Sequence, residues 1–402
     1  MTRGAVSMGG PHVSDEVREM LDRYRQMRRT EPVSQDKDTG RWQVFRYGDG
    51  MTVATDANTF SNDLSEFIPD HEELRTFSKG NFQNMDQPRH RELRGLVSQG
   101  FTPRFVAGMA PRIETVAKEL LDALRDRDRI DLVTDLAQPL PVTVIAEVMG
   151  LPVSDRALFR KWADALLVDN GIDAIFSEQG VAAMAPAIRE MNAYLLNHVR
   201  EYRTSDREGL IGDLIAAETD GMTLDDQEIV GFLALLLIAG HLTTSTLLSN
   251  AILCLDENPD ATRQLRDDPG LLPNAIEEVL RYRSPLFWLD RRARETVELG
   301  GCEIPAGSQV SVALASVSRD EEEFENPDTF DIHRNPVRHL AFGMGAHFCL
   351  GAPLARLEVR IALKALLDRY RDFAVASDEP IVYHDPRGFQ GATHLPVDLL
   401  VA

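Results

Sequence analysis

A glycine-rich stretch that contains one cysteine has the clearest potential for chemistry in this sequence. Residues 342–351 read FGMGAHFCLG, and a helix is predicted directly after them. Cys349 therefore lies at a helix start, where unpaired backbone N–H groups and the positive end of the helix dipole favour a thiolate. Gly343 and Gly345 permit positive φ angles and let the backbone approach a flat ligand, while Gly351 leaves space beside the sulfur. We call residues 342–351 the cysteine loop.

The neighbours of Cys349 limit the kind of metal site it can form. No second cysteine is close in the sequence and no histidine pair has zinc spacing, so a tetrahedral zinc site is disfavoured. A single axial thiolate on haem iron fits these residues better. From the residues alone the alternative is a small buried cysteine without a chemical role, which is the commoner state of a lone cysteine.

The cysteine loop resembles the haem-binding signature of the cytochrome P-450 family, and the likeness extends from about Trp42 to Pro396. The loop residues that carry it are Phe342, Gly343, Gly345, His347, Cys349 and Gly351. The resemblance implies that Cys349 is the proximal iron ligand of haem b (iron protoporphyrin IX). It further implies cofactor-binding roles for Phe342, Gly343, His347 and Gly351. The implied fold is mainly α, a cytochrome P-450-like fold of the soluble bacterial type, with a large helical domain and a small β-rich portion.

The longest predicted helix, residues 225–256, changes abruptly from apolar to polar in its middle. Gly240 costs about 1 kcal/mol relative to alanine in a helix interior, so something must need the missing side chain. Ala239 and Gly240 would let a planar macrocycle and a diatomic ligand lie against the helix. The Thr243 hydroxyl can bond the carbonyl of Ala239 and leave a polar notch. The alternative is an ordinary buried threonine that is satisfied by its own helix.

The resemblance identifies this part of the helix with an oxygen-binding groove, in which Thr243 relays protons to bound oxygen. One residue departs from the family pattern: the position before the threonine is commonly an acid, and here it is Leu242. Protons must then come through water, Thr244, His241 or the substrate. Thr243 and Thr244 are therefore the candidate catalytic residues.

His90 and Arg94 are four residues apart and share a face of a predicted helix. Two such groups can hold paired carboxylates, although a solvated basic face is the plainer interpretation of the spacing. The resemblance implies that His90 and Arg94 bind the haem propionates and that Arg291 does the same.

Glu278 and Arg281 have the i, i+3 spacing of neighbours on a helix. If the pair is buried, loss of one partner costs roughly 3–5 kcal/mol. If it lies on the surface, the pair is worth less than about 1 kcal/mol. The resemblance makes it the second signature of the family, with a structural role in bracing the cysteine loop.

Substrate-contacting positions are expected on three segments. The candidate pocket residues are Leu236, Ala239, Phe287, Trp288, Leu289 and Phe389. The resemblance places the 388–396 segment, as a turn, in the pocket. Because these residues are apolar, we expect a mid-sized hydrophobic secondary metabolite, for which a polyketide (macrolide), a terpenoid or a fatty acid would each fit.

The remaining elements are expected to position these residues. Helices are predicted at 14–28 (capped by Ser14), 105–127, 137–149, 154–168, 180–203, 275–282 and 352–373, with a brief helix capped by Asp56. β-Hairpins are predicted at 42–54 and 297–307. Residues 61–84 lose periodicity, and the resemblance implies that they cover the substrate. Residues 169–180 are predicted to form a mobile lid.

Length and composition limit the class of protein. The 402 residues exceed one simple core, yet no linker or repeat divides them, so a single domain over 1–402 is expected, with 1–14 disordered. A net charge of −21 argues against a nucleic-acid partner. Three cysteines form no disulfide framework and suit a reducing cytoplasm. The longest apolar run, 229–240, is shorter than the ~20 residues that span a bilayer, so a soluble monomer without membrane anchor is expected.

Together these features predict a haem-thiolate monooxygenase that inserts one atom of dioxygen into a hydrophobic small molecule by hydroxylation or epoxidation. No GxGxxG follows a strand, so electrons must come from a ferredoxin or flavodoxin with its reductase. This carrier could dock on Arg334, Arg338, Arg356 and Arg360, although a solvated helix face is the alternative. The rival functions are a peroxide-dependent haem-thiolate enzyme, or one that performs dehydration or ring coupling, a non-catalytic haem sensor or carrier, and a cysteine nucleophile without haem.

Overall fold

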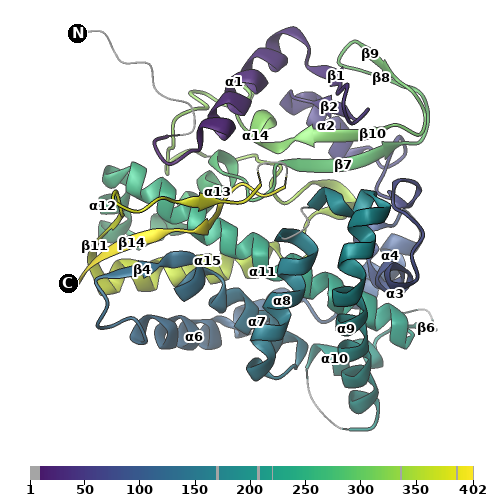
Figure 1. Ribbon diagram of the computed structural model, residues 1–402, viewed down its shortest axis with the longest axis horizontal. Coiled ribbons are helices and arrows are strands. Elements are labelled where there is room, and N and C mark those ends of the chain that lie inside the picture. The colour runs from purple at the N-terminus through teal and green to yellow at the C-terminus, as the bar shows by residue number, and fades with distance from the viewer. Residues whose placement is uncertain are drawn as a thin grey trace.

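Helices form most of the computed structural model, which describes residues 10–168, 172–205, 209–219, 221–335, 337–385 and 388–401. The helices are α1 (Asp15–Thr30), α2 (Tyr47–Thr55), α3 (Glu72–Gly80), α4 (Arg89–Ser98), α5 (Pro103–Gly108), α6 (Ala110–Asp122), α7 (Pro139–Met149), α8 (Arg156–Ala163), α9 (Glu178–Arg203), α10 (Leu210–Ala216), α11 (Asp226–Glu257), α12 (Pro259–Asp267), α13 (Leu272–Tyr282), α14 (Leu314–Val317) and α15 (Ala352–Arg369). Figure 1 shows α6 to α12 and α15 gathered in one helical body, with α1 and a β-rich part at the other end of the molecule. The predicted mainly α architecture is confirmed.

The strands make a small β-rich portion. They are β1 (Val33–Gln35), β2 (Trp42–Val44), β3 (Phe60–Ser61), β4 (Arg129–Asp131), β5 (Glu218–Thr219), β6 (Met222–Thr223), β7 (Trp288–Ala293), β8 (Val297–Leu299), β9 (Cys302–Ile304), β10 (Gln309–Ala313), β11 (Tyr370–Val375), β12 (Val382–Tyr383), β13 (Ala392–His394) and β14 (Pro396–Val401). One sheet has the order β1-β2-β10-β7-β3, in which only the β2–β10 pair is parallel. A second sheet has the order β11-β14-β4.

Helix α11 runs through the middle of the helical body and contacts α3, α7, α9, α13 and α15 (Figure 1). It begins with a capping box, in which the carboxylates of Asp225 and Glu228 each accept a backbone N–H of the other residue. Its length and composition would let it cross a membrane, but 72% of its most apolar stretch is buried inside the protein. An apolar helix that is covered on most sides is the core helix of a folded domain.

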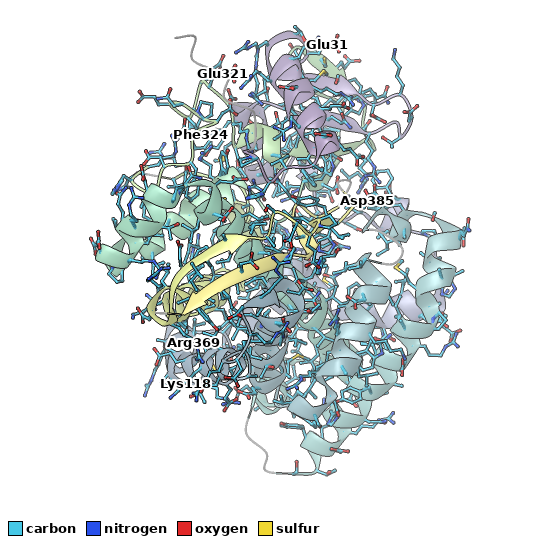
Figure 2. All side chains as sticks on the ribbon, turned by 60° about the vertical axis from the view of Figure 1, so that its left-hand side comes forward. Glu31, Lys118, Glu321, Phe324, Arg369 and Asp385 are labelled. Carbon is cyan, nitrogen blue, oxygen red and sulfur yellow. The ribbon has the colours of Figure 1, made fainter. Side chains whose placement is uncertain are left out.

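Helix α15 begins at the cysteine loop and is fastened at its far end. Arg369, the last residue of α15, pairs with Asp122 of α6 at 2.8 Å. Figure 2 shows Arg369 close to Lys118, which belongs to the same helix α6. The helix was predicted to continue to residue 373, but Tyr370–Val375 forms β11 and pairs with β14 instead.

The predicted hairpin at 42–54 is wrong in its second half. Trp42–Val44 is a strand, but it pairs with β1, and Tyr47–Thr55 is helix α2. The carboxylate of Asp320 accepts the N–H of Tyr47 at 2.7 Å, which satisfies a donor at the helix start from a remote part of the chain. Asp56 does not begin a helix either; it ends α2 and accepts the N–H groups of Asn58 and Thr59.

Local signals elsewhere give the right elements. Ser14 caps α1 by accepting the N–H of Val17, and β8 and β9 form the predicted hairpin around two glycines in the positive-φ region. The helix expected at 105–127 is divided between α5 and α6, and the 61–84 segment contains α3.

Disorder was expected for residues 1–14, of which 1–9 lie outside the described residues. Residues 10–14 contact the body, because Val13 is buried and the N–H of His12 donates to Glu257 Oε1 at 2.8 Å. The expected disorder is therefore wrong for these five residues.

Candidate functional site

The cysteine loop holds its sulfur with backbone groups. Gly343 and Gly345 have φ angles of +66° and +70°, which side chains rarely tolerate, so the loop needs glycine at both positions. The N–H of Cys349 donates to the carbonyl of Phe342 at 2.9 Å. Burial raises the pKa of the Cys349 thiol, and the N–H groups of Gly351 and Ala352, which point at the sulfur, oppose that rise. A thiolate here is best stabilised by a bound metal cation in addition to these donors.

Helix α11 leaves one face uncovered in the middle of the core. Ala239 is exposed and Leu236, Gly240 and Thr243 are half-buried, whereas the neighbouring residues Leu237 and Leu242 are buried. The four residues have the i, i+3, i+4, i+7 spacing of one side of a helix. A Cβ on Gly240 would only make ordinary contact with Ile145 at 3.4 Å, so no protein atom requires the glycine. We call Leu236, Ala239, Gly240 and Thr243 the open face, and its shape fits a flat group lying against the helix.

The hydroxyls on and beside the open face bond their own helix as expected. Thr243 Oγ1 donates to the carbonyl of Ala239 at 2.8 Å, and Thr244 Oγ1 donates to that of Gly240 at 3.1 Å. His241 is 1% exposed, and burial lowers its pKa to about 4. Because it lies about 200° around the helix from Thr243, His241 is turned away from the open face and is excluded as a proton source.

Two histidine rings lie against each other beside the cysteine loop. The rings of His90 and His347 are 3.8 Å apart between centroids, and burial lowers their pKa values to about 4 and about 3. The Gln87 amide nitrogen, a donor, lies 3.0 Å from His90 Nδ1, which must then be the acceptor nitrogen of a neutral ring. The protonated Nε2 of His90 is buried and has no hydrogen-bond partner in the part of the chain that the structure describes.

Two arginines complete this group of donors. Arg94 donates to the carbonyls of Ala346 and Phe348 at 3.0 and 2.5 Å, and so fastens the cysteine loop. Arg291 is 5% exposed and donates to the carbonyl of Asp290, but no carboxylate pairs with it among the described residues. Burial lowers its pKa to about 10. A buried guanidinium normally has an anionic partner, so the site lacks one.

The donors fit the two carboxylates of haem. Arg94, Arg291 and His90 all act electrostatically on His347, which places the four side chains together. With the amide-lined sulfur and the open face of α11, these donors would hold a flat group that carries a metal ion and two carboxylates. The residues present therefore fit haem, for which Cys349 would be the metal ligand.

Replacement of Arg291 by methionine is expected to accelerate haem loss by about 10-fold to 100-fold, because a hydrogen bond to a charged group is worth about 1.5–3 kcal/mol. Transfer of haem to an excess of apomyoglobin measures this rate. The matched control is Arg292→Met, since Arg292 is next in β7 but pairs with the exposed Glu66. Equal rates of haem loss from the two variants would contradict the assignment.

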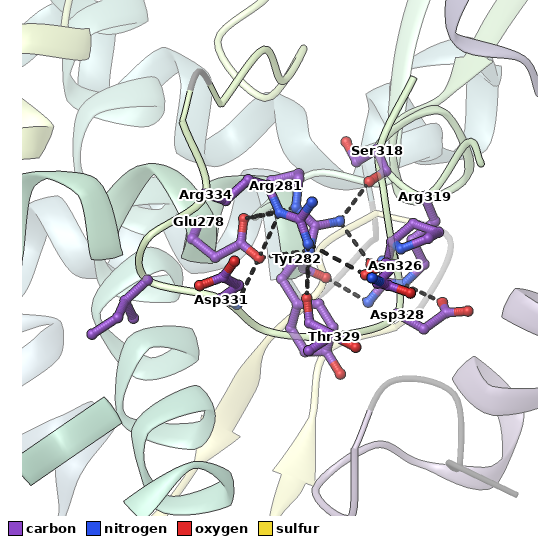
Figure 3. A network of polar contacts seen from close by, with 12 residues as sticks. Glu278, Arg281, Tyr282, Ser318, Arg319, Asn326, Asp328, Thr329, Asp331 and Arg334 are labelled. Carbon is purple, nitrogen blue, oxygen red and sulfur yellow. Dashed lines mark hydrogen bonds and ion pairs between the residues drawn. The ribbon is translucent and has the colours of Figure 1, made fainter. Parts of the chain in front are cut away.

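Glu278 and Arg281 form a fully buried ion pair, with Nε and Nη2 of the guanidinium 2.8 and 2.7 Å from the two carboxylate oxygens. Figure 3 shows the network around it. Arg281 also donates to the carbonyls of Ser318, Pro327 and Thr329, and Glu278 also accepts from Asp331 and Arg334. We call this network the Glu278–Arg281 knot. It joins α13 to the 318–334 segment that leads into the cysteine loop, so the buried alternative is the correct one.

Two of the four arginines predicted to dock a carrier are occupied. Arg334 is a member of the Glu278–Arg281 knot and has 12% side-chain exposure. Arg356 makes a bidentate pair with Glu277 at 2.6 and 2.8 Å and lies over the ring of Phe342. Arg338 and Arg360 are exposed.

The predicted pocket residues separate into two groups. Leu236 belongs to the open face. Leu289 lies beside Gly343, with its Cδ1 3.7 Å from the position that a Cβ on Gly343 would take. Phe389 is buried and forms a β-bridge with Leu286.

One of these predictions needs correction. Phe287 is fully buried and packs with Tyr24 and Phe45 in a separate core cluster, so it does not line an open pocket. Trp288 is half-buried and lies edge-on to Tyr24 at 6.0 Å, and its place in the pocket stays a prediction.

Of the lid predicted at 169–180, residues 169–171 lie outside the described residues. Its next part is tied to the β-rich portion, because Asp173 pairs with Arg41 at 2.9 Å and Arg41 lies over the ring of Phe176 at 5.0 Å. Lid motion stays a prediction.

Two residues that contact the site or its predicted lid were missed from sequence: Gln87, which bonds the His90 ring, and Arg41, which pairs with Asp173. Arg41 and Gln87 act through contacts whose partners are remote or depend on a ring orientation, and no local pattern marks them.

Comparisons with known proteins agree on one family. A family model described as Cytochrome P450 matches residues 158–269 and 270–391. The chain is 43% identical to cyclomarin C epoxidase CymV of Salinispora arenicola, over 93% of this chain and 94% of the relative. It is 40% identical to erythromycin C-12 hydroxylase of Saccharopolyspora erythraea, over 96% of each. Among solved structures, a mutant of P450 EryK in complex with erythromycin B is similar with a TM-score of 0.89 and 39% identity, covering 96% of this chain and 97% of that chain.

Proposed function

The chain belongs to the cytochrome P450 family and is a haem-containing monooxygenase, and we propose that it hydroxylates or epoxidises a large hydrophobic secondary metabolite such as a macrolide. The observation that carries the activity is Cys349, held by amide donors in a loop beside His90 Nε2, which has no hydrogen-bond partner among the described residues, and Arg291, which has no carboxylate partner among them. The substrate class is supported by relatives named for epoxidation of cyclomarin C and C-12 hydroxylation of erythromycin.

Bound haem supplies the activation of dioxygen and the transfer of one oxygen atom to carbon. The chain's own part begins with the ligand, which the N–H groups of Gly351 and Ala352 hold as a thiolate. On the open face, the methyl of Ala239 and the side chain of Leu236 present an apolar surface that disfavours bulk water. The Thr243 hydroxyl stands on the same face and can both accept and donate a proton.

Proton delivery has to work without an acid before Thr243. Leu242 is 1% exposed and has no ionisable group, and the His241 side chain is turned away from the open face. The remaining carriers are the hydroxyls of Thr243 and Thr244, water between them and solvent, and the substrate itself.

Replacement of Thr243 by alanine is expected to uncouple reductant use from product formation, lowering product per electron pair by about tenfold or more. The loss of the hydroxyl removes the proton carrier while leaving the ligand and the fold in place. The measured quantities are product, hydrogen peroxide and reductant consumed. Thr243→Ser keeps the hydroxyl and should restore most of the coupling, whereas unchanged coupling in Thr243→Ala would remove Thr243 from the relay.

Electrons are proposed to come from a separate ferredoxin or flavodoxin with its reductase. The exposed Arg338 and Arg360 support this, because Arg338 lies four residues before the cysteine loop and Arg360 lies in the middle of α15, the helix that follows the loop. Both offer positive charge to an acidic carrier on an otherwise acidic protein. Such docking should weaken as ionic strength rises. We propose that the protein is a soluble monomer in the cytoplasm, with Cys254 and Cys302 as free thiols.

The test of the proposed function is a reconstitution. Purified holoprotein is first titrated with a panel of macrolides, terpenoids and fatty acids while the haem spectrum reports loss of water from iron. The compound that binds is then incubated with ¹⁸O₂, a ferredoxin, its reductase and a reduced nicotinamide cofactor as electron donor, and the product should carry one ¹⁸O atom. Leu242 favours one alternative, a peroxide-dependent enzyme, and product formed with hydrogen peroxide but not with ¹⁸O₂ and the reductase would establish it.

A further inference from the structure

The side chain of Asn250 joins three separate segments of the protein. It is 1% exposed, and its Nδ2 donates to the carbonyl of Arg283 at 3.0 Å and to that of Gln390 at 2.7 Å. Arg283 follows α13, and Gln390 belongs to residues 388–391, which we call the 388–391 turn. Asn250 is seven residues after Thr243, two turns along the same side of α11.

The 388–391 turn packs against α11 one helical turn beyond Thr243. A Cβ on Gly391 would lie 2.4 Å from Cγ2 of Thr246, so the backbone touches the helix side chain and only glycine fits. Thr246 is three residues after Thr243 and belongs to the same side of α11. The turn therefore stands at the C-terminal end of the open face.

The other side of the turn is bonded to the stretch that leads to the cysteine loop. The N–H of Gln390 donates to the carbonyl of Pro285 at 2.9 Å, and Phe389 forms a β-bridge with Leu286. Leu289, three residues further on, lies beside Gly343. The 388–391 turn, strand β7 and the cysteine loop are thus connected by direct contacts. We expect the position of the turn to limit how far a ligand at the iron can extend along α11.

We propose that Asn250 is a positioning residue that sets the depth of the substrate pocket by holding the 388–391 turn against α11. The proposal rests on the proposed function, because it concerns the pocket of that same site. Asn250 acts without touching the substrate, because both N–H groups of its side-chain amide donate to backbone carbonyls, one of Arg283 and one of Gln390. Hydrophobic ligands that reach the turn are selected by length, and ligands too short to reach it are not.

Two substitutions are expected to displace the 388–391 turn, one in its partner on α11 and one in the turn itself. Asn250→Asp keeps the size of the side chain but replaces the shared donor by an oxygen that repels both carbonyls. Gly391→Ala adds a methyl that collides with Cγ2 of Thr246. In the double variant Gly391→Ala/Thr246→Ser the Cγ2 methyl of residue 246 is absent. The next contact of the added Cβ, with Cβ of residue 246 at 3.4 Å, is tolerable, so the turn should regain its original position.

The experiment measures spectral dissociation constants for iron-binding azoles of increasing length: imidazole, 4-phenylimidazole and clotrimazole. Asn250→Asp and Gly391→Ala should bind imidazole as the unmodified protein does, while the ratio of clotrimazole to imidazole affinity changes by about tenfold or more. The double variant should recover the original ratio. Ser249→Ala is the matched control, because Ser249 is equally buried on α11 and its hydroxyl, among the described residues, bonds only the carbonyl of Ser245 in its own helix.

The outcomes separate this inference from the proposed function. An unmodified protein that shows no spectral shift with imidazole has no accessible haem iron, and both proposals then fail. If Gly391→Ala binds imidazole normally and keeps the original ratio of clotrimazole to imidazole affinity, the role proposed for the turn is wrong. The proposed function is not affected by that result. A parallel loss for all three azoles also overturns it, since that result reflects general destabilisation. If Asn250→Asp does not fold, the Gly391→Ala pair still decides.

Discussion

Replacement of Cys349 by serine is expected to abolish the red-shifted band of the reduced carbon-monoxide complex and to lower monooxygenase turnover to background. The serine hydroxyl is a far weaker electron donor than a thiolate, and donation from the axial ligand is what favours cleavage of the O–O bond. The two backbone donors at Gly351 and Ala352 are arranged for an anion, which a neutral hydroxyl does not provide. The measurements are the carbon-monoxide difference spectrum and product formation.

The other cysteines provide the controls for this prediction. Cys302 is half-buried and its thiol donates to the carbonyl of Val33 at 3.2 Å, far in sequence from the cysteine loop. Cys254 is fully buried, and burial raises its pKa to about 12, so it stays a thiol. Cys302→Ser and Cys254→Ala should keep both the band and turnover. A Cys349→Ser protein with unchanged colour and activity would show that another group binds the iron.

The parts of the site that depend on local pattern could be predicted from the sequence. The glycines of the cysteine loop, the polar break in α11 and the i, i+3 spacing of Glu278 and Arg281 all act over a few residues. Their backbone consequences follow from positive φ, helix period and side-chain reach, and the structure has each of them. The large helical domain follows in the same way from periodicity.

Most of the errors involve partners far away in the sequence. Phe287 was assigned to the pocket and Arg334 to a docking surface because their types suit those roles, yet the first packs on Tyr24 and the second on Glu278. Helix α2 forms where a hairpin was expected, because Asp320 satisfies the helix start. Which face a residue presents, and which distant group meets it, is decided by tertiary packing that period and propensity do not contain.

Charge is distributed unevenly between the site and the whole molecule. The chain carries a net charge of −21, yet Arg94 and Arg291 meet beside the cysteine loop with no carboxylate paired to Arg291 among the described residues. Two acids act on Arg291, but Asp290 accepts a hydrogen bond from Ser311 and Asp86 is already paired with Arg294. A protein with so many acids could easily have placed one here, so the gap is best explained by carboxylates that the cofactor brings.

Replacement of Glu278 by alanine is expected to lower stability by about 3–5 kcal/mol, because it leaves Arg281 buried without its partner and also removes the carboxylate that Arg334 contacts. At an unfolding entropy of about 2 cal/mol/K per residue over 402 residues, each kcal/mol corresponds to about 1 °C. A fall in Tm of about 3–5 °C is therefore expected by thermal unfolding of the holoprotein.

The same variant should also hold less haem, because the Glu278–Arg281 knot fastens the 318–334 segment that leads to Cys349. The ratio of haem to protein after purification measures this second effect. Lys364→Ala is the control: its pair with Asp368 has side chains 54% and 58% exposed, so the loss should stay below about 1 kcal/mol and haem content should not change. A Glu278→Ala protein with the Tm and haem content of that control would show that the knot is dispensable, and the cysteine loop would then have to be held by Arg94 and its own backbone bonds.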